Sequence, residues 1–188
     1  MKIAIITGSV RNNRDGSRVV KFTEKVARER GWEVTTIDPS VIELPLLQEM
    51  YKQMKEPAEK FRYIHNTFND ADGFIIVSAE YNHSVPPALK NLLDHFREEY
   101  FFKTSAIISY SSGPFGGVRA VEHLRAICSE LRMPSIPTAM SVSKVHESID
   151  ENGDSVNGDY ERRSKRFLDE FQWFLEAMKT QREKWRPY

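Results

Sequence analysis

The sequence predicts an α/β fold in which helices cover both faces of a parallel β-sheet. Five short apolar runs alternate along the 188 residues with longer segments of helical periodicity. Two of these runs, residues 3–6 and 74–77, are apolar at every position, which is typical of strands buried on both faces. Strands that alternate with helices in this way predict parallel pairing and right-handed crossovers.

The predicted strands cover residues 2–7, 33–38, 73–78, 105–110 and 135–140, and the last has the weakest signal. Between and after them, apolar residues recur at intervals of three and four, which predicts helices. The helical positions are Val19, Phe22, Val26 and Ala27; Phe61, Ile64 and Phe68; Leu89, Leu92, Leu93 and Phe96; Val121, Leu124, Cys128 and Leu131; and Phe167, Phe171, Phe174, Leu175 and Met178.

Two longer connections interrupt this alternation. Residues 39–55 are apolar and contain proline, and we expect them to form a rim or lid. Residues 141–158 are acidic and contain two glycines, and we expect a solvated loop. The sequence shows no internal repeat, so a single domain over residues 1–188 is predicted.

Composition narrows the class of protein. The 27 basic and 27 acidic residues cancel, which argues against binding to nucleic acid or to an anionic membrane. No apolar stretch approaches the roughly 20 residues that span a bilayer. A single cysteine, Cys128, suits a reducing compartment, and its apolar helix face makes it a core residue. No pair of histidines has metal-ligand spacing. We therefore expect a cytoplasmic protein.

The loop after the first strand has the composition of an anion site. Thr7, Gly8 and Ser9 end the strand, and a segment with two arginines and the Gly16-Ser17 pair leads into the first helix. Backbone N–H groups in such a turn, together with a helix N-terminus, favour a phosphate. Neither a P-loop nor a dinucleotide glycine motif is present. The alternative is an ordinary turn in which Ser17 caps the helix.

The loops after the third and fourth strands are also unusual. Residues 78–91 place Tyr81 between Glu80 and Asn82, which offers a flat surface for stacking beside hydrogen-bonding groups. Residues 110–120 contain three glycines, which let the backbone approach a planar ligand closely. Either loop alone is also compatible with a plain connector. In open α/β sheets, however, such loops meet at the carboxyl edge of the strands, where ligands bind.

In order and spacing, these segments resemble the NADPH-dependent FMN reductases. The resemblance covers residues 2 to about 132. It is carried by Gly8-Ser9-Val10-Arg11 with Ser17, by Glu80-Tyr81-Asn82 with Pro86 and Leu89-Lys90-Asn91, and by Gly116-Gly117-x-Arg119-Ala120 with Leu124-Arg125. It implies a flavodoxin-like three-layer sandwich whose five-stranded parallel sheet has the order 2-1-3-4-5.

The resemblance also implies FMN as cofactor and NADPH or NADH as co-substrate. It places the FMN phosphate on Ser9, Arg11 and Ser17. One side of the flavin ring would meet Glu80, Tyr81, Asn82 and His83, and the other would meet Ser111, Ser112, Gly113 and Gly116. The sequence departs from the pattern of this family at two places. Ala79 replaces the usual proline, which would loosen that turn, and the first loop is long, so Asn12, Asn13 or Asp15 can join or leave the phosphate shell.

The activity implied is hydride transfer from NAD(P)H through FMN to a small acceptor such as a flavin, quinone or azo compound. Because the flavin carries this chemistry, no catalytic side chain is predicted. The spacing of the histidines predicts no metal site. His83 is either a donor to the substrate or an exposed loop residue, and Arg14 or Arg119 is a candidate for the NADPH 2′-phosphate. The resemblance also implies a homodimer or a dimer of dimers, with the helix after Pro86-Pro87 as the candidate interface. Burial of that helix against its own sheet is the alternative.

Three other classes compete with this interpretation. A flavodoxin-type electron carrier without substrate turnover has the same fold, but such carriers are usually strongly acidic. A phospho-accepting receiver domain needs an aspartate at the end of the third strand, where Ser78 stands. The third is an interaction protein that has lost its flavin.

Overall fold

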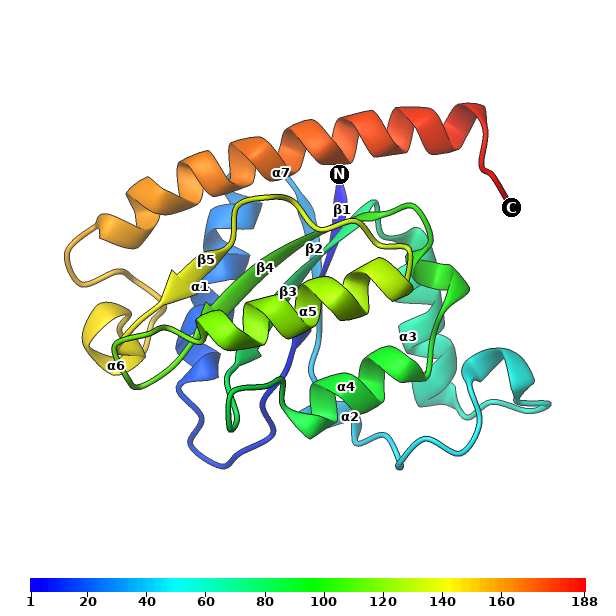
Figure 1. The fold of residues 1–188 in the computed structure, drawn as a ribbon, viewed down its shortest axis with the longest axis horizontal. Coiled ribbons are helices and arrows are strands. Elements are labelled where there is room, and N and C mark those ends of the chain that lie inside the picture. Colours follow the sequence, from blue (N-terminus) through cyan, green and yellow to red (C-terminus); the bar gives the residue numbers. More distant parts are fainter.

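The computed structural model describes residues 1–188, and its centre is one five-stranded parallel sheet (Figure 1). The strand order is β2-β1-β3-β4-β5, as the resemblance implied. The strands are β1 (Lys2–Thr7), β2 (Glu33–Ile37), β3 (Gly73–Ala79), β4 (Thr104–Tyr110) and β5 (Met140–Val142). The first four agree with the predicted strands to within one residue at each end.

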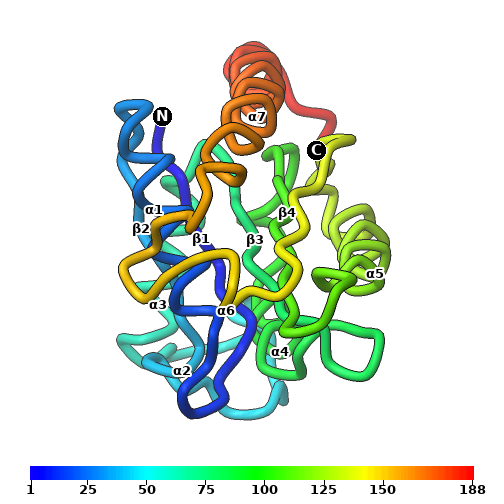
Figure 2. The backbone as a smooth tube through the Cα atoms, turned by 90° about the vertical axis from the view of Figure 1, so that its left-hand side faces the viewer, coloured from blue at the N-terminus to red at the C-terminus, as the bar shows by residue number.

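Helices lie on both faces of this sheet, so α1 and α5 are seen on opposite sides of it in Figure 2. The core residues show that α1 and α7 cover one face while α3, α4 and α5 cover the other. The helices are α1 (Gly16–Arg28), α2 (Pro39–Ile42), α3 (Glu59–Asp70), α4 (Pro87–Asp94), α5 (Val118–Glu130), α6 (Val145–Ser148) and α7 (Asp159–Lys184), with 3₁₀ turns η1 (Tyr51–Gln53) and η2 (Glu98–Tyr100).

Each central strand contributes to two separate cores because its side chains alternate between the faces. In β1, Ile3 and Ile5 pack with α1 and α7, whereas Ala4 and Ile6 pack with the opposite helices. All seven residues of β3 and all seven of β4 are buried. The uninterrupted apolar runs in the sequence therefore reflect strands covered on both sides.

The fifth strand lies further along the chain than predicted. It was expected at residues 135–140, but the paired strand begins at Met140. Ser135 makes only an isolated bridge to Ser105. Pro134 and Pro137 lack the N–H that a sheet ladder requires, so continuous pairing starts only beyond them.

Residues 141–158 do not form the solvated loop that was expected. They include the end of β5 and the short helix α6, and Val145 and Ile149 are fully buried in the core beside α1. Gly153 is buried too, against the backbone of Phe22 on α1. The acidic side chains face outward while the apolar ones anchor the segment to the domain.

The apolar face of α4 is buried within its own subunit. Leu89, Leu92 and Leu93 are at most 1% exposed, and the aromatic residues Phe96 and Tyr100 that follow lie in the same core. Of the two interpretations of this helix, burial against the parent sheet accounts for its apolar face. An interface through α4 would use the outward side of this helix.

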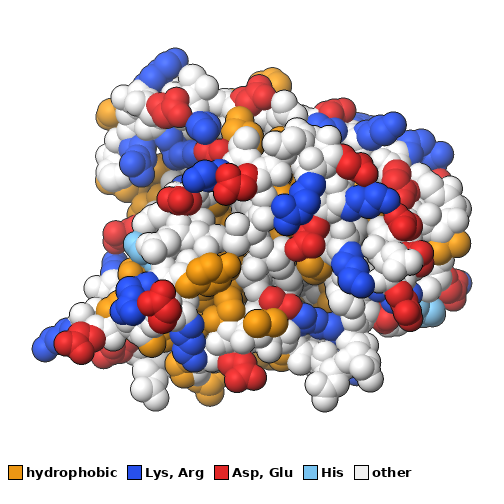
Figure 3. Space-filling model, turned by 180° about the vertical axis from the view of Figure 1, so that it is seen from behind, with side chains coloured by type: hydrophobic (Ala, Val, Ile, Leu, Met, Phe, Trp, Pro, Cys, Tyr) orange, Lys and Arg blue, Asp and Glu red, His pale blue; other side chains and the backbone are white.

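Lysine and arginine side chains are interspersed with aspartate and glutamate on the face shown in Figure 3, which agrees with the neutral net charge. None of the helices combines the length and the apolar character needed to cross a bilayer.

Candidate functional site

The three loops singled out in the sequence lie together at the carboxyl edge of the sheet (Figure 1, lower left). Residues from all three line one cleft there. Its volume is ≈ 210 Å³, and it is lined by Ser9, Arg11, Asn12, Asn13, Arg14, Asp15, Ala79, Glu80, Tyr81, Tyr110, Ser111 and Ser112. The loops come together because β1, β3 and β4 are neighbours in register, with Thr7 opposite Val77 and Ala79 opposite Tyr110.

The cleft contains six of the eleven residues predicted to bind the cofactor: Ser9, Arg11, Glu80, Tyr81, Ser111 and Ser112. The other five do not line it. The Ser17 hydroxyl lies on the first turn of α1 and donates to the Arg14 carbonyl at 3.0 Å. Asn82 and His83 form the exposed tip of the β3 loop, with φ of 48° and 65°.

The two predicted glycines lie on the β5 side of the third loop. The Gly113 carbonyl accepts the Lys144 N–H at 3.0 Å. Gly116 is buried, with Ser143 N only 3.0 Å from the position a Cβ would take, and its carbonyl accepts the Ser109 hydroxyl at 2.8 Å. Both residues therefore shape the loop from behind the cleft.

Most backbone amides of the β1–α1 loop have no hydrogen-bond acceptor within the protein. Between Ser9 and Asp15, only the Arg11 amide has a hydrogen-bond acceptor, which is the Ser9 hydroxyl at 3.4 Å. The loop ends at Gly16, where α1 begins and adds the positive end of its dipole. This set of donors is well suited to a phosphate.

Arg11 is the one charged residue of the cleft wall that has no ionic partner. Arg14 forms an ion pair with Asp38 and also donates to the Ser9 carbonyl. Asp15 lies 3.8 Å from Arg18, and Glu80 lies 3.4 Å from Arg119. The Arg11 guanidinium stands 6.0 Å from the centre of the Tyr81 ring. Arg11 is thus available to an incoming anion, whereas Arg14 and Arg119 are already neutralised.

Three hydroxyl groups gather beneath this loop. The Ser9 hydroxyl is 2.6 Å from that of Tyr81. Tyr110, the last residue of β4, is 6% exposed, and its phenol lies against Gly16 at the start of α1. Burial raises the pKa of Tyr110 to about 12, despite a smaller opposite effect from Ser9. The sequence does not single out Tyr110, because the contact of its ring with α1 depends on the packing of β4 against the first loop.

The β3 loop is closed by hydrogen bonds although alanine stands at residue 79, where the family usually has proline. Tyr81 and Ser84 exchange two backbone hydrogen bonds of 2.9 Å each, which close the turn. The Glu80 carboxylate accepts the Arg119 amide at 3.0 Å and so joins this loop to α5. These contacts constrain the turn in the absence of proline.

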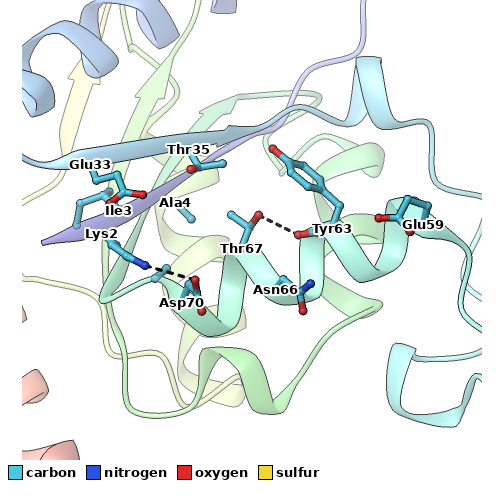
Figure 4. A pocket seen from close by; sticks show the side chains of 11 residues that line it. Lys2, Ile3, Ala4, Glu33, Thr35, Glu59, Tyr63, Asn66, Thr67 and Asp70 are labelled. Carbon is cyan, nitrogen blue, oxygen red and sulfur yellow. Dashed lines mark hydrogen bonds and ion pairs between the residues drawn. The ribbon is translucent and has the colours of Figure 1, made fainter.

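A second hollow, of ≈ 280 Å³, lies between the β1–β2 side of the sheet and α3 (Figure 4). Lys2 and Asp70 face each other there at 3.4 Å, and Tyr63 accepts the hydroxyl of Thr67 through its carbonyl. None of the predicted site residues lines this hollow. Although larger, it is separate from the edge where the three loops converge.

Comparison with known proteins identifies the family. The family model of NADPH-dependent FMN reductases matches residues 1–147. The chain belongs to this family. It is therefore an NAD(P)H-dependent oxidoreductase that uses FMN.

Individual relatives of this FMN reductase agree. The 2-hydroxy-1,4-benzoquinone reductase of a Burkholderia species is 31% identical over 178 residues, covering 91% of this chain and 94% of that protein. The quinone reductase of Escherichia coli K12 is 30% identical over 131 residues, covering 68% and 69%. Among solved structures, the flavoenzyme FerB from Paracoccus denitrificans has the same flavodoxin-like fold. Its TM-score is 0.74 at 19% identity, covering 95% of this chain and 97% of that one.

The cleft of the reductase has the groups that FMN requires. Unpaired amides, hydroxyls and the free Arg11 suit the phosphate, and the Tyr81 and Ser111–Ser112 loops offer flat, hydrogen-bonding walls for a ring system. When bound, FMN supplies the hydride-accepting and hydride-donating chemistry. The protein's own contribution is to bind, orient and stabilise developing charge through backbone N–H groups.

Proposed function

We propose that this reductase holds FMN in the cleft with its phosphate on the β1–α1 loop and its ring between the β3 and β4 loops. The observation that carries the proposal is the run of free amides between Ser9 and Asp15 beside the unpaired Arg11. Ser9 and Arg11 act as side-chain ligands of the phosphate. Ser17 supports the turn through its bond to the Arg14 carbonyl.

The remaining predicted residues divide between the two walls of the ring site. Glu80 and Tyr81 form one wall and Ser111 and Ser112 the other. Asn82, His83, Gly113 and Gly116 act through the shape and backbone of these loops. In this proposal no side chain serves as an acid or base, because hydride passes directly between the nicotinamide and the flavin.

We further propose that the acceptor is a small quinone. Two relatives with at least 30% identity are named as quinone reductases, and one of them aligns over nearly its full length. A planar quinone suits the exposed face of a flavin ring held between the β3 and β4 loops, beside the aromatic ring of Tyr81. NAD(P)H and the quinone would stack on that face of the flavin in turn, which predicts ping-pong kinetics.

Steady-state kinetics test this function. The FMN-loaded protein is assayed with NADH and NADPH against a benzoquinone, free FMN and an azo dye. We expect double-reciprocal plots with parallel lines and the highest kcat/KM for the quinone. A kcat/KM for free flavin or azo dye well above that for the quinone contradicts the acceptor assignment. Absence of NAD(P)H consumption with every acceptor favours an electron carrier instead.

The outward side of α4 is the proposed interface of a homodimer, or of a dimer of dimers. Asn91 on α4 accepts the Leu47 amide at 2.9 Å and donates to the Pro45 carbonyl at 2.8 Å, so it holds an apolar segment beside the helix. Leu46 on this segment is 82% exposed. Light scattering of Leu46→Asp against wild type tests the interface. A cytoplasmic location suits the buried, unpaired Cys128 thiol.

A further inference from the structure

Tyr110 lies where the β4 loop meets the start of α1. A Cβ on Gly16 would stand 2.1 Å from the Tyr110 hydroxyl oxygen and 2.7 Å from the ring carbon that bears it. The phenol therefore occupies the space next to the first helical residue, which only glycine leaves open. Its hydroxyl is placed at the end of the run of free amides.

The Tyr110 hydroxyl lies near that of Ser9, whose hydrogen bond offsets part of the effect of burial on the Tyr110 pKa. The neighbouring Ser9 hydroxyl makes its own close contact with Tyr81, at 2.6 Å. Tyr110 is 6% exposed and lines the cleft, and its hydroxyl lies beside Gly16 at the end of the β1–α1 loop. A pKa of about 12 keeps the phenol protonated at physiological pH, in the form that donates.

We propose that the Tyr110 hydroxyl donates a hydrogen bond to the phosphate of FMN. The inference rests on the proposed placement of that phosphate on the β1–α1 loop. This bond would add a donor from the end of β4 to the donors of the β1–α1 loop. The phosphate would then contact two of the three loops. A hydrogen bond to a charged acceptor is stronger than one between neutral groups.

The carboxylate of Asp15 also lines this end of the cleft and would repel a phosphate. Arg18, at 3.8 Å, offsets part of its charge. A neutral phenol donor is useful at such a position because it binds an anion without adding another charge to the Arg14, Asp15 and Arg18 group.

Paired titrations of the apoprotein with FMN and with riboflavin test the inference, because riboflavin has the same ring but no phosphate. In Tyr110→Phe we expect FMN affinity to fall about tenfold or more and riboflavin affinity to stay unchanged. Tyr160→Phe is the matched control. Tyr160 is also 6% exposed in the same core, but its hydroxyl accepts the Ser143 amide at 3.3 Å.

Two results overturn the role of Tyr110: equal weakening of both ligands in Tyr110→Phe, or no change in either. Inorganic phosphate provides a second measurement, since it should raise the Tm of the wild-type apoprotein more than that of the variant. Arg11→Ala separates the inference from the proposed function. If Arg11→Ala loses the preference for FMN over riboflavin and Tyr110→Phe keeps it, only the Tyr110 assignment fails. If the wild type itself shows no preference, both fail.

Discussion

Glu80 and Arg119 connect the β3 loop to α5 by two contacts of one carboxylate. One oxygen accepts the Arg119 backbone N–H at 3.0 Å, and the other lies 3.4 Å from its guanidinium. Gly117, the residue at the N-cap of α5, has no side chain to cap the helix. Glu80, from a different part of the chain, therefore satisfies an amide that the helix leaves free.

Removal of this carboxylate should destabilise the protein. We expect Glu80→Ala to lower the free energy of unfolding by about 1–2 kcal/mol, the cost of losing a helix cap. Glu80→Gln keeps an acceptor and should lose less. Arg119→Ala should lose least, because that side chain is 41% exposed and its ion pair is screened by solvent. Urea denaturation measures all three, and equal stability of wild type and Glu80→Ala would show that the cap is dispensable.

Arg11→Ala should weaken FMN binding by about 1.5–3 kcal/mol, the contribution of a hydrogen bond to a charged group. Arg11 has no ion pair to lose, so the stability of the apoprotein should not change. Quenching of flavin fluorescence gives the affinity. Arg166→Ala, at an exposed position on α7, controls for the loss of one positive charge. Unchanged FMN affinity in Arg11→Ala would remove the phosphate assignment.

The ion pair between Arg14 and Asp38 should make stability depend on acidic pH. Burial on its own raises the pKa of Asp38, but hydrogen bonds from Arg14 and Ser40 outweigh it, so the pKa lies below its ordinary value. The stabilisation is therefore complete above the unfolded pKa of about 3.9 and is lost as pH falls through the lower, folded pKa.

We accordingly expect Asp38→Asn to reduce stability at neutral pH and to flatten its decline below about pH 4. Denaturation midpoints measured from pH 7 down to the pH at which the protein unfolds without denaturant give the effect. Asp169→Asn, whose side chain is 69% exposed and paired with Arg30, is the control for loss of a surface charge. If the stability of Asp38→Asn declined with falling pH as steeply as that of the wild type, Asp38 would not be the group responsible.

Tyr100 offers a stabilising substitution. It is fully buried, and its hydroxyl has no hydrogen-bond partner. Replacing it with phenylalanine keeps the ring contacts with Phe68 and Phe74 and removes an unsatisfied polar group. We expect Tyr100→Phe to raise the free energy of unfolding by about 1 kcal/mol. Lower stability would show that this hydroxyl has a partner in solution.

Alanine substitutions at Gly117 and Gly158 distinguish the cost of a left-handed backbone from the cost of steric crowding. Both are helix N-cap residues, with φ of 80° and 73°. A Cβ on Gly117 would lie 2.9 Å from the Tyr110 carbonyl, whereas one on Gly158 meets nothing within 4 Å. Gly158→Ala should cost about 1–2 kcal/mol for the left-handed backbone, and Gly117→Ala clearly more. Equal losses would show that the β4 contact relaxes freely.

The first four strands and the five long helices follow from hydrophobic periodicity, because burial on one or two faces leaves a local pattern in the sequence. Hydrophobic periodicity did not locate the start of β5. Its apolar residues Ile136 and Met140 are both buried, but two prolines delay the ladder. Likewise, Val145 and Ile149 in an acidic segment gave too short a signal to distinguish an anchored segment from a solvated loop.

The sequence by itself determined the strand order through the family resemblance, and it determined which three loops share an edge, because loops that follow parallel strands must emerge together. Only the tertiary structure decided which groups in those loops are free. Arg14 is neutralised by Asp38 from β2, Arg11 is not, and Tyr110 reaches the start of α1. The physical reason is the distance along the chain over which each kind of interaction acts. Periodicity is set by neighbours along the chain, whereas an ion pair or a buried hydroxyl depends on side chains that approach within a few ångströms from distant segments.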